Sequence, residues 1–382
     1  MSEFQASNFK KAQGGGAPDI VGKVEFTSPY FFVPPSGDTA SRPQSCAPGT
    51  IRFNTDVGTI EVYRGDTIGW EYIERREGQY LGGGTESNTG TGTRALFFAG
   101  LGPDYKNEIS HLTISTLGND QDFGNCTVTK QAAAGFASRT RGFSTGGLNN
   151  SGQFIDVIEF ATFSSLGDAT DFGNLTTSSN RAAGVSDSTR GITSGGNPNT
   201  NVIDYITMES TGDAVNFGDL TAARQSHQSF SSSTRGVFAG GYIEPNFTNI
   251  IDYITISSTG NATDFGDLLV ARMYGGSFSN STRGVTGGGQ GAPSGNQLNT
   301  IGFVTIATTG NEIDFGDMTT ARRDLPGASS STRGVFVGGD TPSLVNTIDF
   351  VEIATTGNAT DFGDQTVKRD RPSGCSNGHG GL

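Results

Sequence analysis

The sequence predicts an all-β fold, in which a six-bladed β-propeller follows an N-terminal arm and a small β-hairpin. Gly accounts for 58 of the 382 residues, and short runs of Thr, Ile, Val and Phe alternate with clusters of Gly, Asn, Asp and Ser. Such alternation is typical of many short strands joined by tight turns. In addition, a segment of 45 to 50 residues recurs six times, and its length varies in only one part of each unit.

An Asp-Phe-Gly triplet, once with Asn in place of Asp, marks each unit. The triplets begin at Asp122, Asp171, Asn216, Asp264, Asp314 and Asp361. An Arg in a segment similar to Ser-Thr-Arg-Gly also recurs, at Arg94, Arg141, Arg190, Arg235, Arg283 and Arg333. Each of the first five triplets lies 19 residues before the next of these Arg. Fixed spacing indicates packed strands, and a position repeated in every unit usually serves the stacking of the units.

Each unit contains four strand-like segments. In one unit they are "ARQSHQSFSSS", "TRGVFAGG", "NIIDYITIS" with a two-residue period, and "ATDFGDL" after a tight "TGN" turn. A four-stranded antiparallel unit of this length has the size of one propeller blade. Six units therefore predict six blades.

The C-terminus supplies a strand that the first unit lacks. The first unit begins at its second strand, "TRALFFAG", whereas the terminal "KRDRPSGCSNGHGGL" aligns with the first-strand segment "ARQSHQSFSSSTRGV". We expect residues 369–377 to pair with residues 94–100. This pairing would close the first blade and hide two strand edges that otherwise promote association.

The four segments resemble kelch repeats. Kelch repeats have an Arg-led first strand, a second strand ending in Gly-Gly, a third with Tyr and Asp, and a fourth around a Trp. Here "ARQSH", "GVFAGG", "IDYITI" and "DFGDL" occupy these places, over about three quarters of the chain. The usual Trp is replaced by Phe123, Phe172, Phe217, Phe265, Phe315 and Phe362. The resemblance implies a kelch-like propeller.

The triplet is interpreted as structural. The Gly-rich loop, strand Lys and catalytic loop that accompany such a triplet in protein kinases are not present in order. We expect Phe to anchor neighbouring blades, Gly to permit close backbone approach or a bulge, and Asp to cap a turn or pair with Arg. Calcium binding by the oxygens of "TGNATDFGD" is the alternative.

The repeated basic residues are expected to form ion pairs. They comprise the six Arg of the Ser-Thr-Arg-Gly segments and the "AR" group, Arg181, Arg224, Arg272, Arg322 and Arg369. A partly buried charge needs a partner, so a carboxylate of the same or the next blade, such as the triplet Asp, is the expected one. A ring of Arg that binds an anionic glycan or phosphate is the alternative.

Several function classes find no support in the composition. The net charge of −13 leaves no basic surface for nucleic acid or anionic membrane. Three Cys and three His, without metal-ligand spacing or a nucleophile arrangement, predict no metal, no cofactor, no catalytic residues and no enzyme. The sequence shows no signal-peptide core and no run of membrane-spanning length, so cytoplasmic synthesis without membrane insertion is expected.

The N-terminal part differs from the repeats. Residues 1–49 are rich in Gly, Pro and Ser and are expected to form an extended arm that orders against a partner. Residues 50–84 are expected to form a β-hairpin docking module, with "IRFNT" and "TIEVYRG" around "DVG", and residues 85–382 the propeller. The hairpin resembles a module common in bacteriophage tail-fibre and other virion proteins. The residues that carry this resemblance are Arg52, Phe53, Asn54, Thr55, Gly58, Glu61, Tyr63, Gly65 and Trp70.

The repeat wording "STRGVFAGG" and "STGNATDFGDLT" is similar to that of marine cyanophage structural proteins. Together the resemblances imply a virion protein that docks to other virion proteins through its arm and hairpin. Host attachment as a tail-fibre or receptor-binding component is the preferred function. Capsid decoration or tail bracing is the alternative, and a polysaccharide-cleaving enzyme is the third possibility. A homo-trimer is common among fibre proteins, although no heptad repeat enforces one here.

The variable loops between the second and third strands are the predicted binding surface for a host glycan or protein. In an up-and-down blade they emerge on one face, beside the connections from the fourth strand to the next first strand. The candidate residues are Tyr105, Lys106, Asn150, Gln153, Asn199, Tyr242, Glu244, Phe247, Gln290, Gln297 and Asp340. Loops that merely tolerate change are the alternative, because loops vary with or without function.

Overall fold

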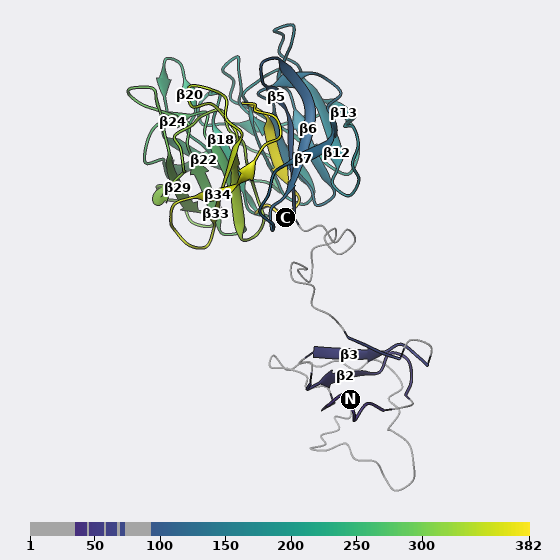
Figure 1. Cartoon of the computed structure of the whole chain (residues 1–382). Helices are drawn as coiled ribbons and strands as arrows, with labels where there is room; N and C mark the ends of the chain where they lie inside the picture. Colours follow the sequence, from purple (N-terminus) through teal and green to yellow (C-terminus); the bar gives the residue numbers. More distant parts are fainter. Residues whose placement is uncertain (1–34, 44–45, 57–58, 67–68, 73–92) are drawn as a thin grey trace, which may run out of the picture. The chain divides into compact units, whose positions relative to one another are not determined.

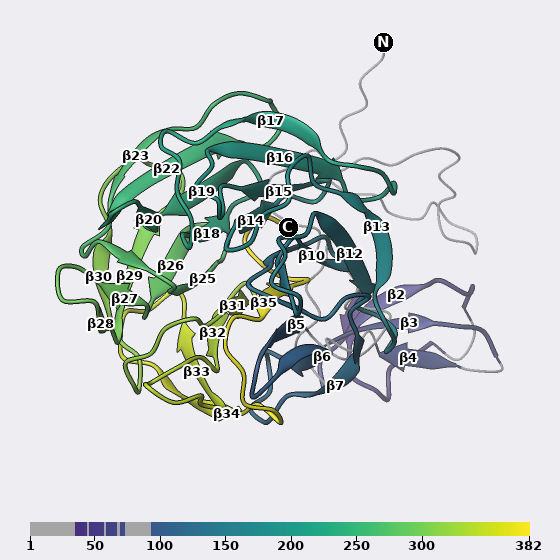
Figure 2. The ribbon, with the colours of Figure 1, turned by 90° about the horizontal axis from the view of Figure 1, so that it is seen from above.

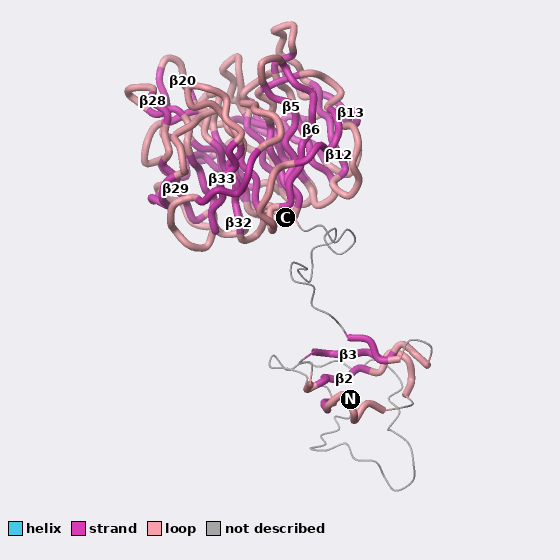
Figure 3. The backbone as a smooth tube through the Cα atoms, viewed as in Figure 1, coloured by secondary structure: helices cyan, strands magenta, loops and turns pink. Residues whose placement is uncertain are grey.

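The computed structural model describes residues 35–43, 46–56, 59–66, 69–72 and 93–382 (Figure 1). The chain divides into two compact units, residues 1–77 and 78–382. The described residues form strands, turns and loops, which confirms the all-β prediction (Figure 3). Among them, no helix is long and apolar enough to cross a membrane. The first 34 residues of the predicted arm and the predicted boundary at residues 84–85 lie outside the described residues.

The first unit contains one four-stranded sheet, in the order β1-β2-β3-β4. Its strands are β1 (Ser36–Gly37), β2 (Ile51–Asn54), β3 (Thr59–Tyr63) and β4 (Trp70–Tyr72). Strands β2 and β3 form an antiparallel hairpin, and β1, which lies within the predicted arm, pairs with β2 in parallel. The described end of the arm is therefore part of this sheet.

A buried carboxylate holds the small sheet together. Glu61 is fully buried and binds Arg42 at 2.5 Å and Arg52 at 3.3 Å, while Asn54 Nδ2 donates to it at 3.1 Å. Burial alone would raise the pKa of Glu61, but these partners lower it below its usual value. Three residues of the phage-like motif thus stabilise the hairpin itself.

The second unit contains six four-stranded antiparallel sheets, numbered here one to six along the chain. Sheet one comprises β35 (Ser373–Ser376), β5 (Arg94–Leu101), β6 (Tyr105–Thr113) and β7 (Gln121–Asn125). Sheet two comprises β9 (Ala134–Ala137), β10 (Arg141–Thr145), β12 (Val157–Thr162) and β13 (Thr170–Asn174). Sheet three comprises β14 (Ala183–Ser186), β15 (Arg190–Ser194), β16 (Val202–Thr207) and β17 (Val215–Asp219).

The remaining three sheets repeat this order. Sheet four comprises β18 (Gln228–Ser231), β19 (Arg235–Ala239), β22 (Ile250–Thr255) and β23 (Thr263–Asp267). Sheet five comprises β25 (Gly276–Ser279), β26 (Arg283–Gly287), β29 (Thr300–Thr305) and β30 (Ile313–Asp317). Sheet six comprises β31 (Gly327–Ser329), β32 (Arg333–Val337), β33 (Thr347–Glu352) and β34 (Thr360–Asp364).

Seven short strands lie in the connections. They are β8 (Lys130–Gln131), β11 (Leu148–Asn149), β20 (Tyr242–Ile243), β21 (Asn246–Phe247), β24 (Arg272–Met273), β27 (Gln290–Gly291) and β28 (Asn296–Gln297). They pair as β8 with β11, β20 with β21, and β24-β27-β28. None of them belongs to the six large sheets.

The C-terminal strand completes sheet one. Strand β35 pairs with β5 in antiparallel register, from Ser373 opposite Phe98 to Ser376 opposite Ala95. The predicted pairing of the chain end with the first unit is therefore present. Strands β5 and β35 lie near the two ends of the second unit in sequence, with the other five sheets between them in the chain. In space they lie side by side (Figure 2).

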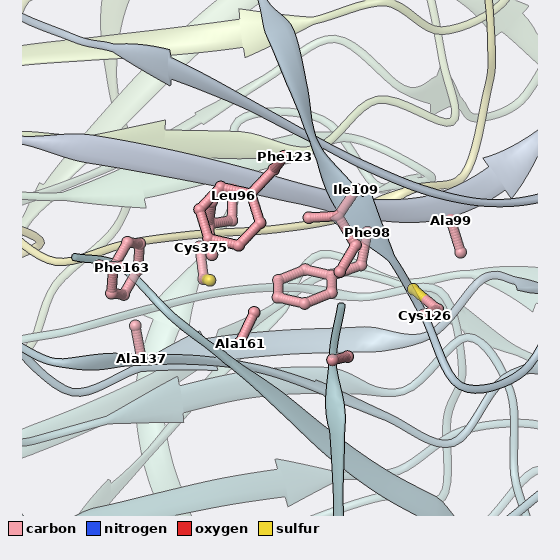
Figure 4. Packing of buried hydrophobic residues seen from close by; sticks show 11 residues of the cluster. Leu96, Phe98, Ala99, Ile109, Phe123, Cys126, Ala137, Ala161, Phe163 and Cys375 are labelled. Carbon is pink, nitrogen blue, oxygen red and sulfur yellow. The ribbon is translucent and has the colours of Figure 1, made fainter. Parts of the chain in front are cut away.

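Each sheet packs on the sheet that follows it. The first strand of each contacts that of the next, and β35 also contacts β9. Six buried apolar clusters span these interfaces. In the cluster between sheets one and two, Leu96, Phe98 and Phe123 face Ala161 and Phe163 (Figure 4). Burial of an aromatic side chain contributes on the order of 2–3 kcal/mol, so each sheet depends on its two neighbours.

The triplet residues divide their roles at these interfaces. Each Phe is buried in an interface cluster, and each Asp or Asn is exposed. The Gly has a positive φ, and a Cβ on Gly124 would lie 2.2 Å from the carbonyl oxygen of Gly167 in the next sheet. A Cβ on Gly363 would lie 2.5 Å from that of Gly118, so the contact recurs from sheet six to sheet one. The predicted roles of Phe and Gly are confirmed.

The repeat Arg residues join neighbouring sheets through backbone carbonyls rather than through the triplet Asp. Arg94 Nη1 donates to the Phe163 carbonyl at 2.7 Å. The other five make the same bond, ending with Arg333 and Ile114 of sheet one. Arg141, Arg190, Arg235, Arg283 and Arg333 also lie over an aromatic ring of the third strand in their own sheet. The predicted carboxylate partner is found for Arg333, which binds Glu352 at 3.0 Å.

A second set of basic side chains is fully buried. Four of them pair with acids of the third strand or of the turn before the fourth strand, whereas Arg369 donates to the carbonyls of Phe97 and Ala99 and to Ser110 Oγ. Arg224 binds Asp252 at 3.1 Å, Arg322 binds Asp349 at 3.1 Å, and Lys130 binds Glu159 at 2.8 Å. In sheet five the third-strand position is Gly302, and Glu312 fills the vacated space to bind Arg272 at 2.7 Å. The predicted pairing with the triplet Asp is wrong, because that Asp faces solvent.

We expect truncation of the last dozen residues, 371–382, to lower the melting temperature sharply. The deletion removes β35, exposes the edge of β5 and uncovers apolar side chains of β31 and β9. Thermal unfolding followed by circular dichroism tests this. An unchanged melting curve would contradict closure of sheet one by the chain end.

We expect Asp252→Ala to lower the free energy of unfolding by about 3–5 kcal/mol, because it leaves the Arg224 guanidinium buried without its partner. The matched control, Asp264→Ala, removes an exposed triplet carboxylate and should change it by less than about 0.5 kcal/mol. Denaturant unfolding measures both. Equal effects of the two substitutions would refute the assignment of the buried pairs.

Candidate functional site

The variable loops and the connections between sheets meet at one end of the second unit. In each sheet, the residue after the second strand bridges the connection that leads into the first strand. The bridges are Leu101 to Asp370, Leu148 to Gln131, Asn197 to Asn180, Tyr242 to Gln225, Gln290 to Met273, and Asp340 to Arg323. This end, called the loop end below, carries every predicted binding residue.

Four of the predicted residues interact across loops. Gln297 Nε2 donates to the Asp340 carbonyl at 2.9 Å, and Arg323 binds the Asp340 carboxylate at 3.2 Å. Arg323 Nη1 also donates to Gln290 Oε1 at 3.2 Å. Tyr105 lies in another cluster, where its hydroxyl accepts a hydrogen bond from Gln131 Nε2 at 3.0 Å.

The other predicted residues stay within their own loops. Tyr242 and Phe247 face each other across the β20–β21 hairpin, with ring centroids 6.1 Å apart. Lys106 lies 4.0 Å from Glu108, and Gln153 bonds to Asn149. Asn150 and Glu244 are exposed and Asn199 is half-buried. The structure therefore does not unite the eleven residues into one site.

Six residues, of which the sequence analysis named only Arg181, form a ring at the loop end. They are Ala132, Arg181, Ser226, Tyr274, Asp324 and Arg371, one from each connection, and are called the left-handed ring. All six have φ between 54° and 62°, the left-handed region that favours Gly. For a residue with a Cβ this conformation costs roughly 1–2 kcal/mol. In a chain with 58 Gly, the ring contains none.

Backbone hydrogen bonds connect the ring into a closed circuit. Each ring N–H donates to the carbonyl of the ring residue in the preceding connection, at 2.7 to 3.1 Å. The last bonds run from Arg371 N–H to the Asp324 carbonyl and from Ala132 N–H to the Arg371 carbonyl. The circuit fixes the backbone, so the strained conformation is imposed by the surrounding structure. The side chains differ at every step except for the two Arg.

The ring surrounds a small pocket of about 100 Å³. Arg181 lies 4.8 Å from the ring centroid of Tyr274 and donates to its hydroxyl. Arg371 binds Asp324 at 3.2 Å, and its Nη1 donates to Gln131 Oε1 at 3.2 Å. The pocket, called the rim pocket, therefore presents cationic, anionic, aromatic and hydroxyl groups together.

A second cavity of about 180 Å³ adjoins the rim pocket and is lined by the first strands of all six sheets. Six residues line both spaces, namely Ala133, Ala182, His227, Gly275, Leu325 and Pro372. His379 of the C-terminal tail also lines this cavity, and its Nε2 lies 3.0 Å from the Ala137 carbonyl. The C-terminus accordingly lies near the centre of the sheets (Figure 2).

Burial controls the charges around the pocket. It raises the pKa of Asp370 to about 6. It lowers the pKa of His227 well below the usual value, and nearby Arg224 adds to this, so His227 is neutral at physiological pH. Burial would also lower the pKa of Arg371, but Asp324 and Asp370 raise it. Arg371 therefore remains charged.

Arg181 occupies a different place from the one the sequence suggested. It was grouped with the "AR" residues, but Ser179 holds that buried position in sheet three, and Arg181 belongs to the left-handed ring. In the other connections the ring residue follows the buried basic residue by two positions, as in Lys130 and Ala132. This spacing was the available signal. The left-handed conformation itself could not be predicted from the sequence, because none of the six positions is Gly, the residue that usually marks it.

No group of three or more His, Cys, Asp or Glu is placed to hold a metal ion within the part of the chain that the structure describes. The three Cys, which are free, include two buried ones, and burial raises the pKa of Cys375 to about 12. Such a thiol is a poor nucleophile.

We expect Ala132→Gly to raise the free energy of unfolding by up to about 1 kcal/mol, since Gly relieves the left-handed strain. Its neighbour Ala133 lacks a positive φ. Ala133→Gly should therefore lower stability by about 0.5–1 kcal/mol through chain entropy. Denaturant unfolding distinguishes the two. If both substitutions destabilise equally, the strain assigned to the ring is wrong.

Comparison with known proteins adds no family. A scan against protein-family models and a search of curated proteins both find no match. The resemblance to kelch repeats and to phage fibre modules therefore remains a prediction from motifs, and the site is argued from the geometry of this chain.

Proposed function

We propose that the six sheets are the blades of a kelch-like β-propeller and that the chain is a phage virion protein which attaches to a host surface. The propeller assignment is supported by the contacts that run from sheet one through sheet six and back to sheet one. The virion assignment is supported by the hairpin motif and by the repeat wording. Under this proposal, the first unit docks to other virion proteins.

The observation that favours recognition is the concentration of variability at the loop end. Strands and triplets repeat from sheet to sheet and four sheets share a buried ion pair, whereas the loops and the left-handed ring vary between connections. A rigid scaffold that presents variable loops is a common arrangement for binding sites. A purely structural role in capsid decoration or tail bracing gives no reason for strained, chemically diverse side chains around one pocket.

We expect the fluorescently labelled full chain to bind saturably to cells, or to extracted surface polysaccharide, of at least one strain in a panel of cyanobacteria. Tyr242→Ala combined with Phe247→Ala removes two half-buried aromatic side chains of the β20–β21 hairpin at the loop end and should weaken binding. The control, Leu117→Ala with Leu166→Ala, removes two exposed apolar side chains from turns between third and fourth strands and should leave it unchanged.

Absence of binding across the panel would favour the structural alternative. If Leu117→Ala with Leu166→Ala weakens binding, the ligand binds at the turns between third and fourth strands and not at the loop end. Release of reducing ends from the polysaccharide would instead identify the third candidate, a cleaving enzyme.

A further inference from the structure

We propose that the rim pocket binds one sugar-acid unit, a hydroxylated carboxylate such as a hexuronic acid residue of an acidic polysaccharide. The inference rests on the proposed recognition function and names its ligand class. Three observations support the proposal: one Arg has no carboxylate partner, buried acceptor and hydroxyl oxygens have no hydrogen bonds, and the pocket has a suitable size.

Arg181 provides the site for the carboxylate. Within the described structure its partners are the ring and hydroxyl of Tyr274, and neither carries a charge. The other Arg that lines the pocket, Arg371, is compensated by Asp324, and Arg323, outside the lining, is compensated by Asp340. In a chain with a net charge of −13, this guanidinium is a local positive centre. A guanidinium binds a carboxylate through two parallel hydrogen bonds.

Two ring residues provide sites for hydroxyl groups. Ser226 and Asp324 are 8 % and 7 % exposed, and both line the rim pocket. Ser226 Oγ and Asp324 Oδ2 have no hydrogen-bond partner among the described residues, and Arg323 Nε lies 3.7 Å from the latter. A buried polar atom without a partner costs roughly 1–3 kcal/mol. A ligand hydroxyl would satisfy either atom, and only a donor can satisfy the Asp324 carboxylate.

The combination selects against simpler ligands. Inorganic phosphate or acetate can bind Arg181, but its negative charge is repelled by the Asp324 carboxylate. Neither ligand has a chain of hydroxyl groups that could reach from Arg181 to Asp324. A neutral hexose matches Ser226 and Asp324 but leaves Arg181 without a counter-charge. The volume of about 100 Å³ is well below the roughly 300 Å³ at which pockets for drug-sized ligands begin. A single sugar residue is therefore the appropriate size.

Titration of the full chain with sodium glucuronate, followed by ligand-observed NMR, tests the proposal. We expect glucuronate to bind at least about tenfold more tightly than glucose or sodium acetate, because only glucuronate meets both halves of the pocket. Arg181→Ala should reduce glucuronate binding to the level of glucose. The variant should fold, since Ala132 occupies the equivalent ring position. Arg181→Lys keeps the charge without the two-pronged donor and should be intermediate.

Lys368→Ala is the matched control, because it removes one exposed positive charge from a connection at the loop end outside the pocket lining and should leave glucuronate binding unchanged. Equal binding of glucuronate and glucose to the unaltered chain would overturn the proposal. So would unchanged glucuronate binding by a folded Arg181→Ala variant, or an equal loss in Lys368→Ala.

The cell-binding assay keeps this proposal separate from the general function. If the chain binds cells but not glucuronate, the ligand assignment fails and recognition through the loops stands. If it binds glucuronate but no cell or polysaccharide, host attachment fails and the rim pocket stands.

Discussion

The second unit depends on one constraint, namely that no sheet can bury its apolar side chains or satisfy its edges without two neighbours. Three sets of contacts show this, because each runs from sheet to sheet and continues from sheet six to sheet one. The triplet Gly packs on a turn Gly of the next sheet, the repeat Arg bonds to a carbonyl of the next sheet, and the left-handed ring joins all six connections. Each set would be broken by the loss of one sheet, so the fold is cooperative although its sequence is modular.

The residues that stabilise the sheets are different from those of the proposed binding pocket. The buried ion pairs, such as Arg272 with Glu312, lie below the loop end and hold the connections in place. Above them, the hydrogen-bonded circuit fixes the backbone of the left-handed ring independently of its side chains, which range from Ala132 to Tyr274. A position whose backbone is determined by its neighbours is free to vary chemically. This freedom explains how six equivalent ring positions can carry five different residue types on a scaffold of similar units.

The periodic part of the structure could be read from the sequence, and the aperiodic part could not. Strand number, strand order within a unit and the pairing of residues 373–376 with the first unit follow from fixed spacings and alternation. The partners of the buried Arg did not follow, because Asp252 and Asp264 are equally acidic in sequence and only the structure shows that Asp252 is buried and Asp264 exposed. The left-handed ring was missed because its residues share a conformation rather than a type. Glu312 was missed because it compensates for Gly302 from another strand.

The central claim is that the chain end pairs into sheet one and so joins sheet six to sheet two. Hydrogen exchange measured by mass spectrometry tests it directly in the unaltered protein, through the amides of residues 371 and 374–376 and those of the equivalent residues 324 and 327–329. In a closed arrangement both segments donate to equivalent backbone partners, and we expect them to exchange at similar, slow rates. Fast exchange of residues 371 and 374–376 beside slow exchange of residues 324 and 327–329 would contradict the account, because it would show a terminal strand that is only loosely attached.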